Sequence, residues 1–155
     1  MSGVYRNRLR RIQAELTAAR EAIAYVSRHW QQESVVKEIA SIVTQHDFLL
    51  AAANIEKTYF VRLYAEVEGI LKYHLAANHA TISIGDKPKV DWLISRVSRA
   101  EGVAIDRNLR LKMDGVRDYR NAIAHHRLPA AQFVSFASAL STLNQFLSKL
   151  PDPNR

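Results

Sequence analysis

The sequence predicts an all-α fold, an up-and-down bundle of about five to six helices. Apolar residues recur at intervals of three and four, as on one face of a helix, rather than alternating as in a strand. Only five glycines and four prolines interrupt the 155 residues. A chain of this length is expected to bury one hydrophobic core. We therefore expect a single helical domain over residues 1–155.

Residues 1–31 are expected to form a basic helix with a heptad pattern. Its apolar positions are spaced alternately by three and four residues: Leu9, Ile12, Leu16, Ala19, Ile23, Val26 and Trp30. Such a seam packs against another helix of the same chain or against its copy in a second chain, and the pattern leaves both open. The same segment has six arginines, among them Arg8 and Arg11, against two acids.

The next segments are predicted to be a short helix and then a long one. The short helix runs from about Ser34 to Val43, and the long one opens at a capping-box spacing in Thr44 to Asp47 and reaches about Ala77. Its core face between residues 60 and 74 is expected to consist of Phe60, Leu63, Val67, Ile70 and His74. Glu66 and Glu68 flank that face on opposite sides.

Residues 81–88 break the helical pattern and are expected to form the main loop, followed by a short helix over residues 90–100. A further helix is predicted to begin after Asp106, a favourable N-cap, and to close at Leu128 and Pro129. The core region that carries it spans residues 44–127. The C-terminal helix is expected over residues 130–150, with these residues facing inward: Phe133, Phe136, Leu140, Leu143 and Leu147.

The formal net charge of +7 indicates an acidic partner, of which nucleic acid is the commonest, although a solvated basic surface has the same composition. The chain has no cysteine, so we expect neither a disulfide framework nor a thiolate metal site. Its histidines lack metal-ligand spacing, so no metal or cofactor is expected. We find no apolar run long enough for a membrane span and no apolar segment of a secretory signal, which favours a cytoplasmic protein without membrane contact.

The most informative residues lie in the helix that follows Asp106. The apolar stripe of this helix consists of Leu109, Met113, Val116 and Ile123, and Arg120 falls on the same stripe. Arginine is rarely buried without a partner, because removing its charge from water is costly. Arg120 is therefore expected to be half of a buried ion pair or part of a site. Asn121 and His125 follow it within one and a half turns.

The run from Val116 to His126 resembles the signature of the HEPN family (higher eukaryotes and prokaryotes nucleotide-binding domains), which has an arginine, a polar residue, a short variable run and a histidine. Upstream, the segment from Leu63 to Lys72 is similar to an earlier helix of the family that often carries a glutamate. The two segments cover about the middle half of the chain.

This resemblance implies a metal-independent endoribonuclease, acting as a homodimer in a toxin or phage-defence system, with RNA and a cognate antitoxin or defence protein as partners. Arg120, Asn121 and His125 would be its catalytic residues. The resemblance favours Glu68 as the partner of Arg120, although periodicity does not choose between Glu66 and Glu68. The alternative for Glu68 is an exposed pair with Lys72 at i,i+4.

An arginine and a histidine without metal ligands suit phosphodiester transfer in RNA, where the 2′-OH supplies the nucleophile. On an ideal helix Arg120 and His125 are about 140° apart, so one copy does not aim both at one point. Two motifs facing across a dimer would, and the resemblance implies that arrangement. Further RNA-binding candidates are Arg117, His126, Arg127, Arg8 and Arg11.

Two alternatives remain at this stage. His126 and Arg127 also suit the C-terminal end of a helix, where cations are stabilised by the helix dipole. For the whole chain, the alternative to a nuclease is a non-catalytic HEPN-like helical module that binds RNA or a protein partner.

Overall fold

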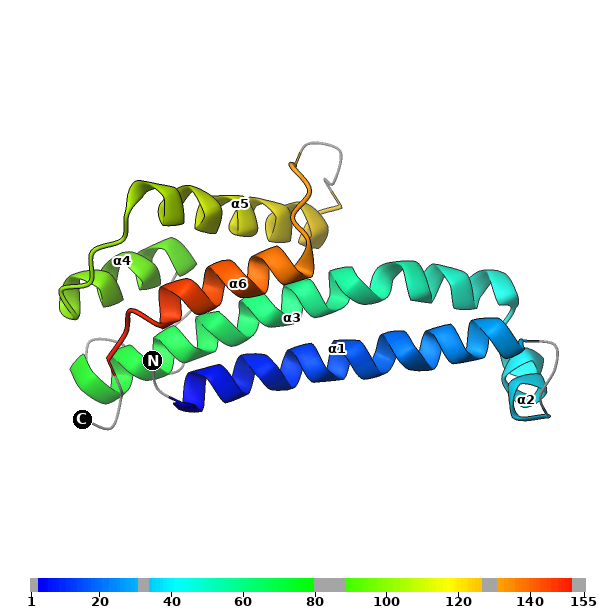
Figure 1. Cartoon of the computed structure of the whole chain (residues 1–155). Helices are drawn as coiled ribbons and strands as arrows, with labels where there is room; N and C mark the ends of the chain where they lie inside the picture. Colours follow the sequence, from blue (N-terminus) through cyan, green and yellow to red (C-terminus); the bar gives the residue numbers. More distant parts are fainter. Residues whose placement is uncertain (1–2, 31–33, 80–88, 127–130, 152–155) are drawn as a thin grey trace.

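The computed structural model describes residues 3–30, 34–79, 89–126 and 131–151, and these ranges contain six helices and no strand (Figure 1). The predicted all-α bundle is therefore confirmed. The helices are α1 (Gly3–His29), α2 (Ser34–Ile42), α3 (Gln45–His79), α4 (Val90–Ala100), α5 (Arg107–Ala124) and α6 (Phe136–Leu147).

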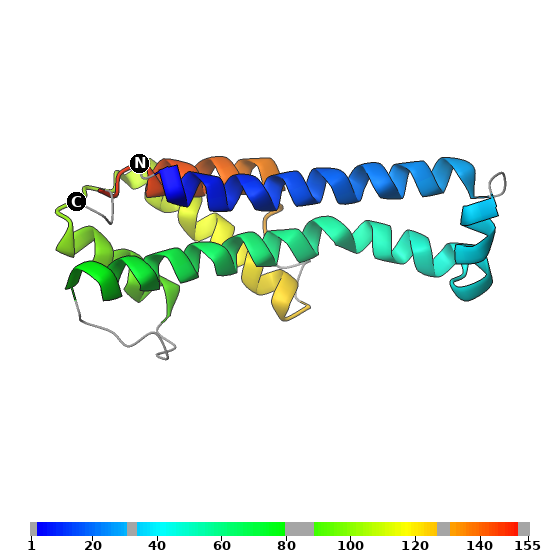
Figure 2. The same cartoon turned by 90° about the horizontal axis from the view of Figure 1, so that it is seen from below.

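The long helices α1 and α3 lie side by side, and α2 connects them at one end of the molecule (Figures 1 and 2). Helices α4, α5 and α6 cover only the other half of α3. Helix α5 packs on α3 and α6, and α6 also contacts α1. The residues 20–30 and 34–55 therefore form an arm that extends beyond the bundle.

The N-terminal half of the heptad seam packs on α3 of the same chain. Tyr5, Leu9, Ile12 and Leu16 are buried there. The later seam positions lie in the arm and are only half-buried, and the ring of Trp30 contacts that of Phe48 with centroids 5.2 Å apart. Within the bundle, the seam therefore packs against another helix of the same chain.

The predicted core face of α3 is confirmed, because all five of its residues are buried. His74 is fully buried, and its two ring nitrogens are hydrogen-bonded to the Tyr5 hydroxyl at 2.9 Å and to Glu101 Oε1 at 2.6 Å. His74 therefore joins α1, α3 and the end of α4, which is a structural role.

Local chemistry explains where α3, α4 and α5 begin or end. Thr44 Oγ1 accepts a hydrogen bond from the Asp47 backbone at 3.1 Å, as the capping-box spacing predicts. Helix α4 ends at Glu101, and Gly102 follows with a φ of 62°. The Asp106 carboxylate caps α5 by accepting from the Leu109 backbone at 2.8 Å.

Two predicted boundaries are wrong. Helix α5 ends at Ala124 rather than at Leu128, because His126 adopts a left-handed φ of 54°. Helix α6 begins at Phe136 rather than at residue 130. The Ser135 hydroxyl accepts from the Ser138 backbone, and the Glu56 carboxylate from α3 accepts from the Phe136 backbone.

The late start of α6 also places Phe133 outside the helix. Its side chain is 68% exposed instead of facing inward. The predicted loop over residues 81–88 and the expected closing residues Leu128 and Pro129 lie outside the described residues. Among those that are described, no helix is both long and apolar enough to cross a membrane.

Candidate active site

Arg120 lies partly buried on α5, and its guanidinium has no carboxylate partner in the described part of the chain. Nη1 donates to Asn121 Oδ1 at 3.1 Å, and the guanidinium carbon is 5.5 Å from the centroid of the Tyr64 ring. Nε is buried and has no hydrogen-bond partner among the described residues. Arg120 is thus held by an amide and an aromatic ring, and its charge is not neutralised.

The Arg120 pocket is an open cavity of about 430 Å³ between α3, α4 and α5. Its charged or polar lining residues are Tyr64, Glu68, Lys89, Asp91, Arg117 and Asn121, beside Arg120 itself. The Tyr64 hydroxyl is buried and, like Arg120 Nε, has no partner in the described ranges. Of the four buried side-chain polar atoms without partners among the described residues, these two belong to residues of the pocket, and the others are Ser98 Oγ and Asn144 Oδ1. Two such atoms on the lining of one pocket are consistent with a site for a polar ligand.

Tyr64 remains a neutral hydrogen-bond donor in this pocket. Its burial, with a smaller contribution from the Asp91 carboxylate, raises the pKa of Tyr64 above its ordinary value of 10.0. The ring therefore provides a neutral aromatic face against which the guanidinium packs.

Glu68 lines the same pocket, but the expected ion pair with Arg120 is not among the contacts of the described residues. Glu68 pairs instead with Lys72 at 2.9 Å, four residues later on α3. Glu66, the other acid that periodicity allowed, pairs with Arg8. The i,i+4 alternative for Glu68 is therefore the arrangement that the structure shows.

Arg117, a predicted RNA-binding residue, is already surrounded by carboxylates. It donates to Asp118 at 2.9 Å, to Asp91 at 2.7 Å and to Asp114 at 3.1 Å. The hydrogen bonds to Asp118 and Asp91 raise the pKa of Arg117 above its ordinary value. Arg117 thus joins α5 to the start of α4 and fixes one wall of the Arg120 pocket, rather than offering a free charge to RNA.

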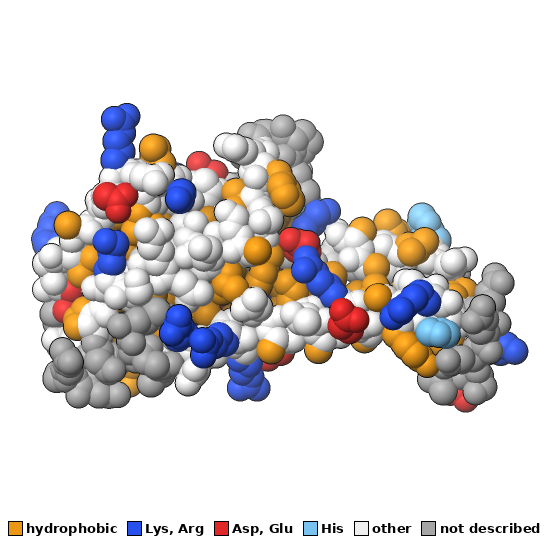
Figure 3. All heavy atoms as spheres, viewed as in Figure 1, with side chains coloured by type: hydrophobic (Ala, Val, Ile, Leu, Met, Phe, Trp, Pro, Cys, Tyr) orange, Lys and Arg blue, Asp and Glu red, His pale blue; other side chains and the backbone are white. Residues whose placement is uncertain are grey.

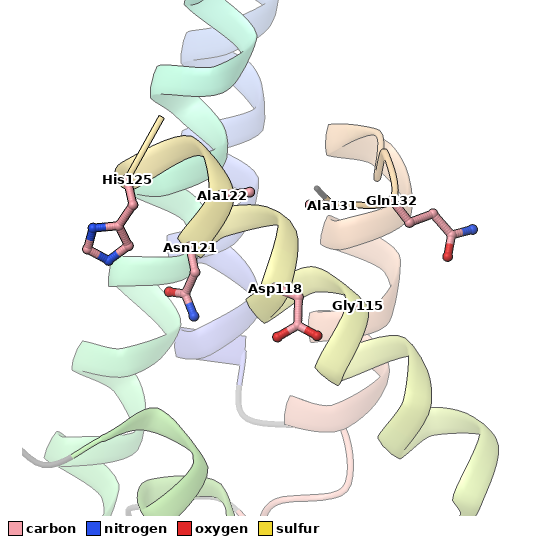
Figure 4. Close-up of a pocket in the computed structure, with 7 residues that line it drawn as sticks. All are labelled: Gly115, Asp118, Asn121, Ala122, His125, Ala131 and Gln132. Atoms are coloured by element: carbon pink, nitrogen blue, oxygen red, sulfur yellow. The ribbon is translucent and has the colours of Figure 1, made fainter. Parts of the chain in front are cut away.

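His125 occupies the C-cap of α5, and its side chain is exposed. Its backbone N–H donates to the Asn121 carbonyl at 3.0 Å, while its imidazole has no hydrogen-bond partner among the described residues. Figure 4 shows the side chains of His125, Asn121 and Asp118 on one side of α5. With Gly115 and Gln132 they line the His125 pocket, an open cavity of about 410 Å³.

The motif residues therefore share Asn121 but do not converge within one chain. Asn121 lines both pockets, whereas Arg120 lines only the Arg120 pocket and His125 only the His125 pocket. The angular separation expected from the sequence is thus reflected in two adjacent cavities. The amide of Asn121 bonds to Arg120 rather than to the imidazole.

The other RNA-binding candidates are dispersed. Arg8 and Arg11 lie on α1, where they pair with Glu66 and Glu15, and α3 and α6 lie between α1 and α5 (Figure 1). His126 lines a third pocket, toward α3. Arg127 lies outside the described residues.

Sequence reasoning missed several residues that line these pockets, among them Asp118, Tyr64, Lys89 and Asp91. Asp118 precedes His125 by seven residues, so helical spacing could have placed it on the same face. Tyr64 and Lys89 reach the Arg120 pocket only because α3 and α4 pack beside α5, and no local signal in the sequence indicates this.

The described ranges hold no group of three or more histidine, aspartate or glutamate side chains that could bind a metal ion. Comparison with protein-family models, with curated proteins and with solved structures finds no match to this chain. The candidate site therefore depends on the geometry of its own residues and on the resemblance of the motif.

Proposed function

We propose that this chain is a cytoplasmic, metal-independent endoribonuclease of the HEPN type that acts as a dimer, in a toxin or phage-defence system. Arg120 would bind the phosphate, His125 would transfer protons, and Asn121 would position Arg120. The proposal is supported by the resemblance of the run from Val116 to His126 and by the geometry of these three side chains.

The observation that carries the proposal is the unpaired guanidinium of Arg120. A partly buried cation with an unpartnered Nε is destabilising unless it binds an anion, so its presence needs an explanation other than packing. A phosphate oxygen would satisfy Nε and the charge together. Lys89, on the rim of the same pocket, has no carboxylate partner among the described residues and would add a second cation.

The proposed reaction needs no group beyond these side chains and the RNA. The 2′ oxygen attacks the adjacent phosphorus, the bond from phosphorus to the 5′ oxygen breaks, and a 2′,3′-cyclic phosphate forms. His125 accepts the proton from the 2′-OH and delivers it to the departing 5′ oxygen, so that one imidazole carries out both transfers. Arg120 stabilises the charge that develops on the phosphate.

A second copy of the chain would bring the phosphate-binding Arg120 and the proton-transferring His125 together. Since Arg120 and His125 line different pockets of one chain, a partner that presents its own motif across an interface would place His125 of one copy opposite Arg120 of the other. The exposed Leu111 and Phe133, which flank the groove between α5 and α6, offer apolar surface beside the motif for such an interface.

The test is cleavage of a fluorescently labelled single-stranded RNA in EDTA. Wild type is expected to cut and to leave 2′,3′-cyclic phosphate ends, detected by mass spectrometry. His125→Ala should abolish cleavage. His46→Ala, which removes an exposed imidazole of the arm instead of the motif, should not. RNA with a 2′-deoxy sugar at the cut position should stay intact. Cleavage that requires Mg²⁺, or that survives His125→Ala, would refute the mechanism.

The second candidate is a non-catalytic helical module that binds RNA or a protein. The separation of Arg120 and His125 into two pockets favours it if the chain is monomeric. It predicts RNA binding that Arg120→Met weakens, without cleavage by any form of the protein.

A further inference from the structure

The arm carries exposed apolar residues that nothing in the described structure covers. Leu49 and Leu50, in the first turns of α3, are 52% and 51% exposed. Figure 3 shows hydrophobic side chains on the surface of the arm as well as on the bundle. Isolated exposed leucines are common in soluble proteins, so their position relative to other features decides whether they matter.

Leu50 begins a stripe that leads to the end of α5. Leu50, Asn54, Lys57 and Val61 follow one another at spacings of four, three and four on one face of α3. The last three of them line the His126 pocket, a cavity of about 500 Å³ that Ile123 and His126 of α5 complete. The surface is therefore a groove between α3 and α5, with Leu50 as its apolar continuation, and Leu49 lies about 100° away around the helix.

The charge of this surface is positive. Lys57 and His126 are the ionisable residues that line the pocket, and no lining residue is acidic. The Lys57 ammonium donates to Asn54 Oδ1 at 3.1 Å and has no carboxylate partner among the described residues. The neighbouring Glu56 is used elsewhere, by Arg20 and by the Phe136 backbone.

From this juxtaposition we propose that the face of α3 from Leu50 to Val61, with the end of α5, is the docking site for an acidic amphipathic helix of a partner protein. The helix would place apolar side chains on Leu50 and a carboxylate beside Lys57 and His126. An acidic helix would give Lys57 the carboxylate partner that it lacks among the described residues.

RNA fits this groove less well than an acidic helix does. A single lysine and a histidine provide little of the cationic surface that phosphate backbones require, and RNA gains nothing from covering Leu50. A docked helix would lie beside His126, one residue after His125 in the sequence. The docking surface itself does not depend on the proposed nuclease activity.

The test uses a phage-displayed library of helical peptides with fixed leucines at i, i+3, i+4 and i+7 and all other positions randomised, selected on the purified full chain. Enriched peptides are expected to be acidic. Leu50→Ser and Lys57→Glu should each weaken their binding by about tenfold. Tyr73→Ser, which removes an apolar side chain of equal exposure farther along α3, should leave binding unchanged. Circular dichroism confirms that each variant is folded.

A charge reversal makes the test specific. Selection on Lys57→Glu should enrich basic peptides in place of acidic ones. Enriched peptides without an acidic bias, or without loss of binding to Leu50→Ser, would overturn the proposal. If Lys57→Glu instead weakens binding of a labelled single-stranded RNA while the selected peptides ignore both substitutions, the surface contacts RNA and the proposal is also wrong.

Discussion

Arg117 and Arg120 lie one turn apart on α5 and have opposite surroundings. Arg117 meets three carboxylates, whereas Arg120 meets an amide, an aromatic ring and no acid in the described region. Arg117 is therefore used for structure, and Arg120 is available to a ligand. The sequence alone does not distinguish them, because the partners of Arg117 include Asp91 from another helix.

This contrast predicts different effects of two matched substitutions. Arg117→Met leaves Asp91 and Asp118 without their cation, while Asp114 keeps Arg110, and should reduce the free energy of unfolding by about 1 to 2 kcal/mol, since the pairs are partly exposed. Arg120→Met removes a buried Nε that has no partner and should change the free energy of unfolding by less than about 1 kcal/mol. Urea unfolding measures both. A larger loss for Arg120→Met than for Arg117→Met would show that Arg120 is structural.

The N-cap of α5 predicts a defined pH dependence. The hydrogen bond from the Leu109 backbone lowers the pKa of Asp106 below its ordinary value of 3.8. A carboxyl group with a depressed folded-state pKa stabilises the fold above its unfolded pKa and loses this contribution as the pH falls. Asp106→Asn keeps an accepting oxygen but does not titrate. The stability advantage of wild type over Asp106→Asn should therefore shrink below about pH 4 in urea unfolding. An advantage that is constant down to pH 3 would contradict this.

At the level of elements, the sequence predicted what local chemistry determines. The starts of α3 and α5 follow from side-chain caps at Thr44 and Asp106, and α4 ends before a glycine. The end of α5 depends on the left-handed backbone of His126, which the sequence pattern does not indicate. The start of α6 has a local cap in Ser135, which the sequence analysis did not use, and a second cap in Glu56, 80 residues away from Phe136.

Substitution by alanine should change the free energy of unfolding in opposite directions at two glycines. Gly102 has a φ of 62°, and a Cβ there would meet nothing within 4 Å. Gly102→Ala should therefore destabilise by about 1 kcal/mol through backbone strain alone. Gly69 lies inside α3, where a Cβ also meets nothing, so Gly69→Ala should stabilise by about 0.5 to 1 kcal/mol. Thermal and urea unfolding report both changes. Effects of the same sign would refute the backbone argument.

At the scale of the whole molecule, the helices bring Tyr64, Lys89 and Asp91 to Arg120, and no pattern within α5 anticipates this. The motif itself was found by resemblance and by the position of an arginine on an apolar stripe. The expected contact between Glu68 and Arg120 is absent for a local reason, since Lys72, four residues later on the same helix, takes that carboxylate. The basic N-terminal helix also packs away from α5, so total charge was a poor guide to where an RNA would lie.

The arrangement of two pockets around Asn121 makes a prediction about the assembled protein. If His125 of one copy works with Arg120 of the other, then Arg120→Met and His125→Ala should each be inactive alone, but a mixture should cut RNA. In an equimolar mixture about half of all dimers would be heterodimers, and each heterodimer would have one intact site of two. Activity should therefore recover to about a quarter of wild type. Light scattering should give a dimer mass for all three proteins. A monomer mass, or a mixture as inactive as its components, would show that the two residues do not act across an interface, and the helical-module alternative would then be preferred.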